Sequence, residues 1–241
     1  MKEQQNRIIE NLIAFEGADG TGKTTLSKTF IEKMNLTNTG VEFKYFAIPT
    51  HDEPIGKNII RPILAGDVQV KHPLTLQYLI HAEDLEFEEY FTDDNKDLHL
   101  MGVRDRSYIS AIVYSKLVIK NNPKYTTELN NFHNLIINSA WPEYIILLQA
   151  DKETLNRRIS SRKGKVEIFD APEYAEMLAE LYDYKILDKF IEENNIGTKL
   201  IVVQVDSDNI ETNVERIIEG YKFLHNNQHL HTVYVGDVER E

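Results

Sequence analysis

The segment FEGADGTGKTT, residues 15–25, constrains the fold of this chain more than any other feature. An apolar run, LIAF (12–15), leads into it, and a helix-like stretch (23–34) follows it. The glycines and the lysine match the spacing G-x-x-x-x-G-K-[ST] in the strand–loop–helix context that this phosphate-binding loop requires. Backbone N–H groups of such a loop turn inward onto phosphate oxygens, and the helix adds its positive N-terminal end. We therefore expect nucleotide phosphates to bind at Gly17, Ala18, Gly20, Thr21, Gly22, Lys23, Thr24 and Thr25.

Three of the charged or polar residues at this site have specific expected roles. Lys23 should reach the β- and γ-phosphates, and the Thr24 hydroxyl should bind Mg²⁺. Asp105, in VRDRSYISAIVY, falls at the end of a predicted strand (98–103), where a carboxylate can hold Mg²⁺ or its water. Arg106 beside it is either a clamp on the substrate or half of an ion pair, and the phosphate-binding loop favours the clamp.

Apolar runs alternate with helical patterns along the chain, which predicts a parallel sheet covered by helices on both faces. We expect a doubly wound α/β domain over residues 1–225 and a C-terminal tail over 226–241. Ligands of such sheets bind at the carboxyl ends of the strands, where the segments above lie. The five expected strands are 12–15, 41–48, 98–103, 144–149 and 200–205, and the expected helices are 23–34, 55–65, 73–91, 107–121, 126–138, 152–162, 172–194 and 209–225.

Composition restricts the class of partner. The 241 residues carry a formal net charge of −12, which argues against a nucleic acid or an anionic membrane as partner. No cysteine is present, so disulfides and a cysteine nucleophile are excluded. The N-terminus is too polar for a signal peptide, and no apolar run approaches membrane-spanning length. We expect a soluble, cytoplasmic protein.

A basic segment, TLNRRISSRKGKVEIFD (154–170), contrasts with the acidic chain. Arg158 and Arg162 are four residues apart and share one face of a helix. A basic helix that runs into a glycine-containing loop suits a lid, here at about 158–170, that excludes water and stabilises a transferring phosphoryl group. The alternative is a solvated basic helix face.

These motifs resemble the thymidylate kinase family of P-loop nucleoside monophosphate kinases, over roughly residues 8–225. FEGADGTGKTT, DRSYISAIVY and the basic segment all have counterparts in that family, including Ser110 of the second motif. The resemblance implies ATP as donor, Mg²⁺, a deoxynucleoside monophosphate as acceptor, with dTMP as the leading candidate, and a homodimer. It implies that Asp19 contacts the sugar 3′-hydroxyl and Arg106 the acceptor phosphate. The resemblance also implies a role for the lid: in the variant of the family with a glycine after this acid, as Gly20 follows Asp19 here, arginines of the lid stabilise the transition state. These would be Arg158 or Arg162.

The sequence departs from the family pattern in the acceptor pocket. His51 stands where the family has an arginine for the acceptor phosphate, and Asp84 stands where an arginine reads the thymine carbonyl. Ile80 replaces the aromatic residue that stacks on the base, so Tyr78 or His81 is the candidate for stacking. Asp84 either accepts from N–H groups of a base or pairs with a neighbouring cation.

Two alternative functions remain open at this point. The chain also resembles deoxyribonucleoside kinases. In that case Glu53 would deprotonate the sugar 5′-hydroxyl and Gln77 would contact the base, while Arg106 and Ser107 would match the E-R-S motif of those kinases. A nucleotide-binding switch is the other alternative, and the basic lid argues against it. Asp19 and the Ile55-Gly56 segment favour the monophosphate kinase.

Overall fold

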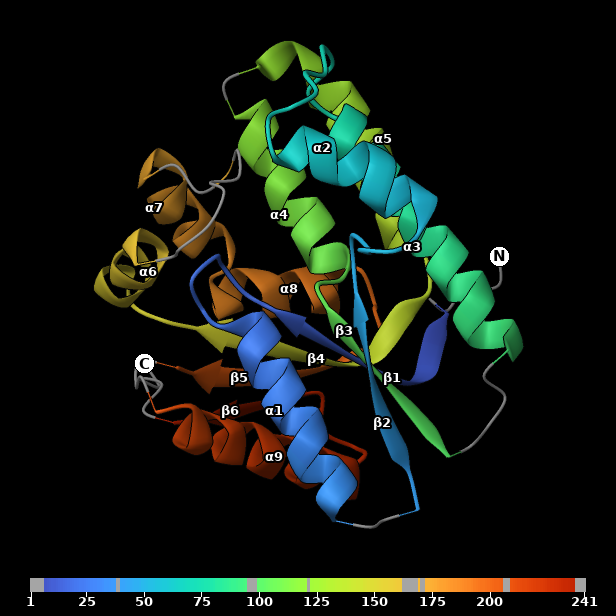
Figure 1. Ribbon diagram of the computed structural model, residues 1–241, viewed down its shortest axis with the longest axis vertical. Helices are drawn as coiled ribbons and strands as arrows, with labels where there is room; N and C mark the ends of the chain where they lie inside the picture. The colour runs from blue at the N-terminus through green and yellow to red at the C-terminus, as the bar shows by residue number, and fades with distance from the viewer. Residues whose placement is uncertain are drawn as a thin grey trace.

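The computed structural model describes residues 7–37, 40–94, 99–120, 122–161, 169, 172–205 and 209–236. At the centre lies a six-stranded parallel sheet with the strand order β2-β3-β1-β4-β5-β6 (Figure 1). The strands are β1 (Ile8–Glu16), β2 (Glu42–Ala47), β3 (Leu100–Asp105), β4 (Trp141–Gln149), β5 (Lys199–Gln204) and β6 (Thr232–Val235). The doubly wound α/β fold expected from the sequence is confirmed.

The expected number of strands, five, is wrong. Residues 232–235 lie within the segment expected to be a tail, yet they form β6 and pair in parallel with β5, from Leu200 opposite Thr232 to Val203 opposite Val235. The sequence TVYV consists of β-branched and aromatic residues, which suit a strand. Four residues at a sheet edge are too few to give a clear alternating pattern, so this strand escaped the sequence analysis.

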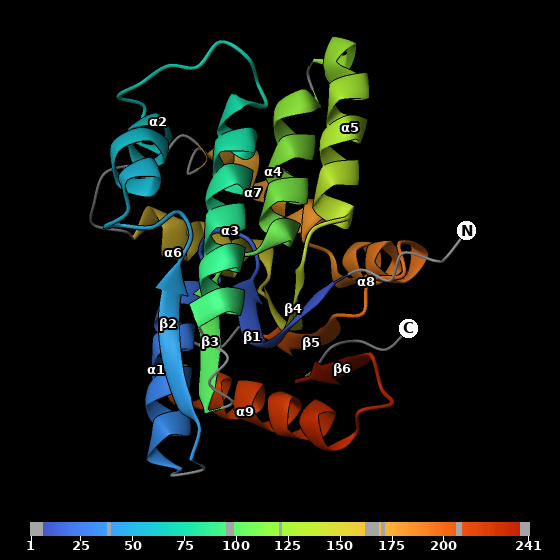
Figure 2. The ribbon, with the colours of Figure 1, turned by 90° about the vertical axis from the view of Figure 1, so that its right-hand side faces the viewer.

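Helices cover both faces of the sheet, as Figures 1 and 2 show. Helices α1 (Lys23–Leu36) and α9 (Ile210–Asn226) lie on one face. On the other face, α3 (Thr75–Asp94), α4 (Tyr108–Ile119) and α5 (Thr126–Ile137) stand side by side (Figure 2). The remaining helices are α2 (Arg61–Leu64), which continues a π-helical turn at Gly56–Ile60, α6 (Lys152–Ser160), α7 (Pro172–Leu181) and α8 (Tyr184–Glu193), and a short 3-10 turn spans Pro123–Tyr125.

Side chains along each strand point alternately to the two faces of the sheet, and each face has its own hydrophobic core. In β1, Ile13 and Phe15 face α1 and α9, whereas Leu12 and Ala14 face the opposite layer. Successive side chains of a strand point to opposite faces, so a strand buried on both sides reads as a continuous apolar run. The central strands of this chain follow that pattern, and the polar residues gather where the strands end.

One expected helix, 172–194, is divided in two. Helix α7 ends at Leu181, and α8 begins after Asp183, whose carboxylate accepts from the backbone N–H of Lys185 at 2.8 Å. An aspartate in this position satisfies an N–H group that the first turn of a helix leaves open. The break brings Tyr182 into the interior, where it reaches the site described below. Among the described residues, no helix is both long enough and apolar enough to cross a membrane.

Candidate active site

The loop between β1 and α1 has the conformation expected of a phosphate-binding loop. Gly17 adopts φ of 143°, and a Cβ at this position would lie 2.4 Å from the carbonyl oxygen of Leu148. Only glycine fits there, because the conformation is strained for other residues and the backbone of β4 is too close. The Lys23 ammonium folds back over the loop and donates to the carbonyl oxygens of Gly17 at 2.8 Å and Ala18 at 3.0 Å.

Lys23 is buried, and this burial lowers its pKa to about 8, with a further lowering from the nearby Arg106 guanidinium. Desolvation disfavours the charged amine, whereas a bound anion would favour it. A nucleotide phosphate would therefore restore the full positive charge of Lys23.

Two oxygen ligands meet beside the loop. The Thr24 hydroxyl donates directly to Asp105 Oδ2, and the Tyr45 hydroxyl donates to the same oxygen at 3.2 Å. Thr24 lies in the first turn of α1 and Asp105 ends β3, so the two elements bring a hydroxyl and a carboxylate together. Hard oxygen atoms of this kind suit Mg²⁺, which takes few protein ligands and fills its shell with water and phosphate oxygens.

Arg106 is paired and also lines the cavity. Its Nη2 donates to Asp19 Oδ1 at 2.6 Å, and its Nη1 donates to the Ser110 hydroxyl at 3.1 Å. The Tyr114 hydroxyl donates to the other oxygen of Asp19 at 2.6 Å, and the Arg106 guanidinium lies over the Tyr114 ring. The two interpretations of Arg106 are therefore compatible, because the pair with Asp19 holds the guanidinium in the cavity wall.

A buried glutamate supports this arrangement from behind. Glu16, at the end of β1, accepts from the Ser107 hydroxyl at 2.8 Å and from the Ser110 hydroxyl at 2.8 Å. It also accepts from the Tyr182 hydroxyl at 3.3 Å, which reaches in from the junction of α7 and α8. Its carboxylate thus fixes the first turn of α4, which contains Ser110 and directly follows Arg106 and Ser107.

A cavity of about 600 Å³ opens in front of these groups, within the usual size range of small-molecule sites. It runs from the phosphate-binding loop to the walls formed by β3, α3 and α4. The sequence-predicted residues that line it are Asp19, Gly20, Gly22, Lys23, Thr24, Thr25, His51, Gln77, Asp84, Asp105, Arg106, Ser107, Ser110 and Arg158.

Asp84 lies in the cavity wall and pairs with a cation. It forms a buried ion pair with Arg104 of β3, and each side chain is only 1% exposed. Burial raises the pKa of Asp84 to about 6, against the opposing effect of the Arg104 guanidinium. The structure therefore supports the pairing that the sequence left open.

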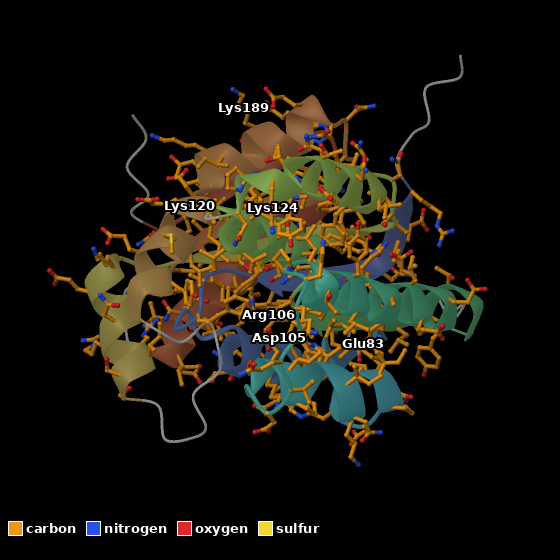
Figure 3. All side chains as sticks on the ribbon, turned by 90° about the horizontal axis from the view of Figure 1, so that it is seen from above. Glu83, Asp105, Arg106, Lys120, Lys124 and Lys189 are labelled. Atoms are coloured by element: carbon orange, nitrogen blue, oxygen red, sulfur yellow. The ribbon has the colours of Figure 1, made fainter. Side chains whose placement is uncertain are left out.

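Figure 3 shows Glu83 on α3 together with Asp105 and Arg106 at the end of β3. Glu83 Oε1 accepts from the Thr50 backbone N–H at 2.9 Å and from the Thr50 hydroxyl at 2.6 Å. A Cβ on Gly56 would lie 2.4 Å from the same oxygen, so the loop and α3 pack without space for a side chain there. This contact holds the segment that brings His51 and Arg61 to the cavity.

Three predicted substrate-binding residues lie outside the cavity. Glu53 is exposed on the loop before Gly56. Tyr78 is 39% exposed and its ring packs against Phe132, 4.9 Å between centroids. His81 is buried between Tyr108 and Phe132, and burial lowers its pKa. On α3 it is Ile80, between these two residues, that faces the cavity.

The segment expected to be a lid is described in part. Arg158 donates from Nη1 to the Gly20 carbonyl at 3.3 Å and from Nη2 to the Val205 carbonyl at 3.0 Å. It therefore lies against the phosphate-binding loop. Arg162 and most of the expected lid, 162–168 and 170, lie outside the described residues.

Comparison with known proteins assigns the family. A sequence model described as Thymidylate kinase matches residues 15–217, most of the chain. The chain belongs to the thymidylate kinase family. A probable thymidylate kinase of Methanococcus maripaludis is 33% identical over 175 residues, which cover 72% of this chain and 76% of that protein. A probable thymidylate kinase of Sulfolobus acidocaldarius is 31% identical over 219 residues, which cover 88% of this chain and 97% of that protein.

Solved structures support the P-loop kinase fold. The thymidylate kinase of Candida albicans aligns with a TM-score of 0.67 at 20% identity, over 90% of this chain and 92% of the other. A deoxyadenosine kinase of M. mycoides aligns with a TM-score of 0.58 at 21% identity, over 88% of this chain and 99% of the other. Kinases of both classes therefore share the fold of this chain, and the family match assigns the chain to the thymidylate kinases.

The structure adds residues to the thymidylate kinase site that the sequence analysis did not single out. Tyr114 lies four residues after Ser110 on one face of α4, which is a readable helical spacing. Arg104 is a charged residue in an otherwise apolar buried strand, which is also a readable signal. Phe169 also lines the cavity, and its ring lies 4.8 Å from that of Tyr114, but no local pattern indicated this contact.

Proposed function

We propose that this chain transfers the γ-phosphoryl group of ATP to the 5′-phosphate of dTMP and forms dTDP. Membership of the thymidylate kinase family makes it a nucleoside monophosphate kinase with ATP as donor. The observation that supports the proposal best is Arg106, held by Asp19 and Ser110 in the wall between the phosphate-binding loop and the rest of the cavity. A guanidinium at this point can bring two anions together, because it offsets their repulsion.

The residues divide the work between donor and acceptor. Lys23 and the loop amides hold the β- and γ-phosphates of the donor, and Arg106 holds the acceptor phosphate. Asp19 holds the sugar of the acceptor, with its carboxylate fixed by Arg106 and Tyr114. Arg158, already against the loop, and Arg162 stabilise the charge on the transferring group.

Mg²⁺ would be held by Thr24 and Asp105, whose oxygen atoms already meet. When bound, the ion neutralises charge on the phosphates and fixes their orientation. The direct hydrogen bond between the two side chains supports this assignment, because both belong to the ligand type that Mg²⁺ prefers.

The position of Glu53 does not support transfer to a free nucleoside. A hydroxyl acceptor loses its proton during transfer and needs a base within hydrogen-bond reach. Glu53, the expected base, is exposed and does not line the cavity. A phosphate acceptor is already a nucleophile and needs cations, which Arg106 and Arg61 offer in the cavity wall.

The assembly and location follow from the family resemblance. We propose a homodimer formed through α3 and α5, where Tyr78, Leu85 and Leu135 are 39%, 48% and 50% exposed. Light scattering after gel filtration would measure its mass, and a monomer at working concentration would contradict it. A cytoplasmic location and a lid at about 158–170 stay predictions.

Tracing the transferred phosphate tests the proposed function. ATP labelled in the γ-phosphate is incubated with dTMP, Mg²⁺ and the protein, and the products are separated by chromatography. Label in dTDP supports the proposal. Label in inorganic phosphate alone, at the same rate with and without dTMP, would make the protein a nucleotide hydrolase and overturn it.

A further inference from the structure

Two oppositely charged side chains face the acceptor end of the cavity from different elements. Asp84 comes from α3 and Arg104 from β3, and Arg104 Nη2 pairs with Asp84 Oδ1. Arg104 also lies over the Phe87 ring, with its guanidinium carbon 4.8 Å from the centroid. The ion pair and the aromatic ring together fix the plane of the guanidinium.

Each partner keeps one polar atom unused. Asp84 Oδ2 and Arg104 Nε are buried and have no hydrogen-bond partner among the described residues. Buried polar atoms in folded proteins are nearly always hydrogen-bonded, and an unsatisfied one costs stability. A donor and an acceptor left open in one ion pair, in the wall of a substrate cavity, indicate that a ligand satisfies them.

The surrounding wall fits a nucleobase. Gln77, Ile80 and Asp84 are spaced at i, i+3 and i+7 on α3 and share the helix face that lines the cavity. This face offers an amide, an apolar surface and a carboxylate. A planar, apolar ring with a polar edge is complementary to such a set.

We propose that Arg104 and Asp84 together read the polar edge of the acceptor base. Arg104 Nε donates to a base carbonyl, and Asp84 Oδ2 accepts from the adjacent ring N–H. Thymine presents this combination at its carbonyl groups and N3–H. The inference rests on the proposed function for the identity of the base.

This assignment explains the departure from the family pattern at residue 84. The family places there an arginine that donates to a thymine carbonyl. In this chain the cation comes from β3 instead, and the aspartate on α3 orients it. A guanidinium donor therefore remains available to the base.

The test compares wild type with the double variant Asp84→Asn/Arg104→Gln, which keeps two polar side chains of similar size without burying a lone charge. Calorimetry measures binding of the four deoxynucleoside monophosphates and of dTMP methylated at N3, which lacks the N–H. We expect wild type to bind dTMP at least about 10-fold more tightly than the methylated analogue, because a missing partner leaves the site unsatisfied. In the double variant, dTMP binding should weaken about 10- to 100-fold and the preference over the analogue should largely disappear.

A second double variant serves as the matched control. Arg7→Gln/Glu88→Gln removes another ion pair of α3, with atoms 3.9 Å apart, that does not line the cavity. It should leave the ranking of nucleotides unchanged, and ATP affinity and the melting temperature show whether each variant is folded.

An unchanged nucleotide ranking in the folded Asp84→Asn/Arg104→Gln variant would overturn the inference and leave the pair a structural role. Failure of the proposed function would look different. It would appear in wild type, as absence of dTDP formation, whatever the double variant binds.

Discussion

Arg106 and Asp19 join the two strands that build the site: a guanidinium nitrogen at the end of β3 lies 2.6 Å from a carboxylate oxygen of the phosphate-binding loop. The hydrogen bond ties the donor loop to the segment that receives the acceptor. Arg106 adopts φ of 81°, a left-handed conformation that few side chains other than glycine adopt. Strain of this kind persists where surrounding contacts hold it, and here Asp19, Ser110 and Tyr114 do so.

Replacement of Lys23 should remove activity while the fold stays intact. Among the described residues, the ammonium contacts loop carbonyls and the Asp19 carboxylate, so Lys23→Ala should cost turnover a factor of at least about 100, as loss of a charge-stabilising donor does. Steady-state ADP release measures the rate. Lys57→Ala, at an exposed position outside the cavity, is the control. Near-normal turnover of Lys23→Ala would contradict the donor-site assignment.

Replacement of Arg106 should affect the acceptor more than the donor. Arg106→Gln removes the charge and keeps an amide that can reach Ser110, so we expect kcat/KM for dTMP to fall at least about 100-fold. The dissociation constant of ATP should change by less than about 5-fold. Equilibrium binding of a fluorescent ATP analogue separates the two effects. An equal loss of ATP and dTMP binding would mean that Arg106 acts on the loop as a whole.

Stability should fall as the pH rises from about 4 to about 7 because of Glu88. Burial raises the pKa of Glu88 to about 7, with a smaller contribution from Asp84, and the Tyr108 hydroxyl donates to its carboxylate. The folded state therefore holds a proton that the unfolded state releases near its ordinary pKa of about 4.3. The stability that this group contributes is highest at low pH. It is lost as the pH rises from about 4.3 to about 7, by up to about 4 kcal/mol.

Glu88→Gln removes this titration and keeps an acceptor for Tyr108. The variant should melt at a higher temperature than wild type at pH 8, and the difference should shrink at pH 5. Glu89→Gln, on the exposed side of the same helix, is the matched control and should show no such trend. The assignment would be refuted if the melting temperatures of wild type and Glu88→Gln changed by the same amount from pH 5 to pH 8.

The sixth strand should contribute to stability. Removal of residues 228–241 deletes β6, exposes the edge of β5, and removes Tyr234, whose ring packs on Tyr184 at 5.0 Å. We expect a lower melting temperature, at about 2–4 °C for each kcal/mol lost in a chain of this size. Removal of 237–241 alone leaves β6 in place and should change little. Equal melting temperatures for the two truncations would show that β6 adds nothing.

Local sequence was enough to predict which residues gather around the phosphate-binding loop. The loop that contains Gly17 and Lys23 has a fixed spacing, and Asp105 and Arg106 follow a strand directly. Each of these signals is contained in a few consecutive residues. The chemistry of phosphate binding needs them close together in the chain, so the pattern is readable.

The acceptor half depends on contacts between distant segments and was less predictable. Asp84 and Arg104 are 20 residues apart and meet only because α3 packs on β3. Tyr78, Ile80 and His81 lie within one turn, and a small error in the rotation of α3 changes which of them faces the cavity. The choice of Tyr78 or His81 as the stacking residue required knowledge of that rotation, which the structure supplies.

The central claim is tested most directly by ADP release from ATP and Mg²⁺ in the presence of dTMP or thymidine at equal concentrations. Wild type should turn over rapidly with dTMP and only at the background rate with thymidine, because Arg106 lines the cavity for a phosphate acceptor, whereas Glu53, the expected base for a hydroxyl, does not line it. Turnover with thymidine and not with dTMP would contradict the account and assign the protein to nucleoside phosphorylation instead.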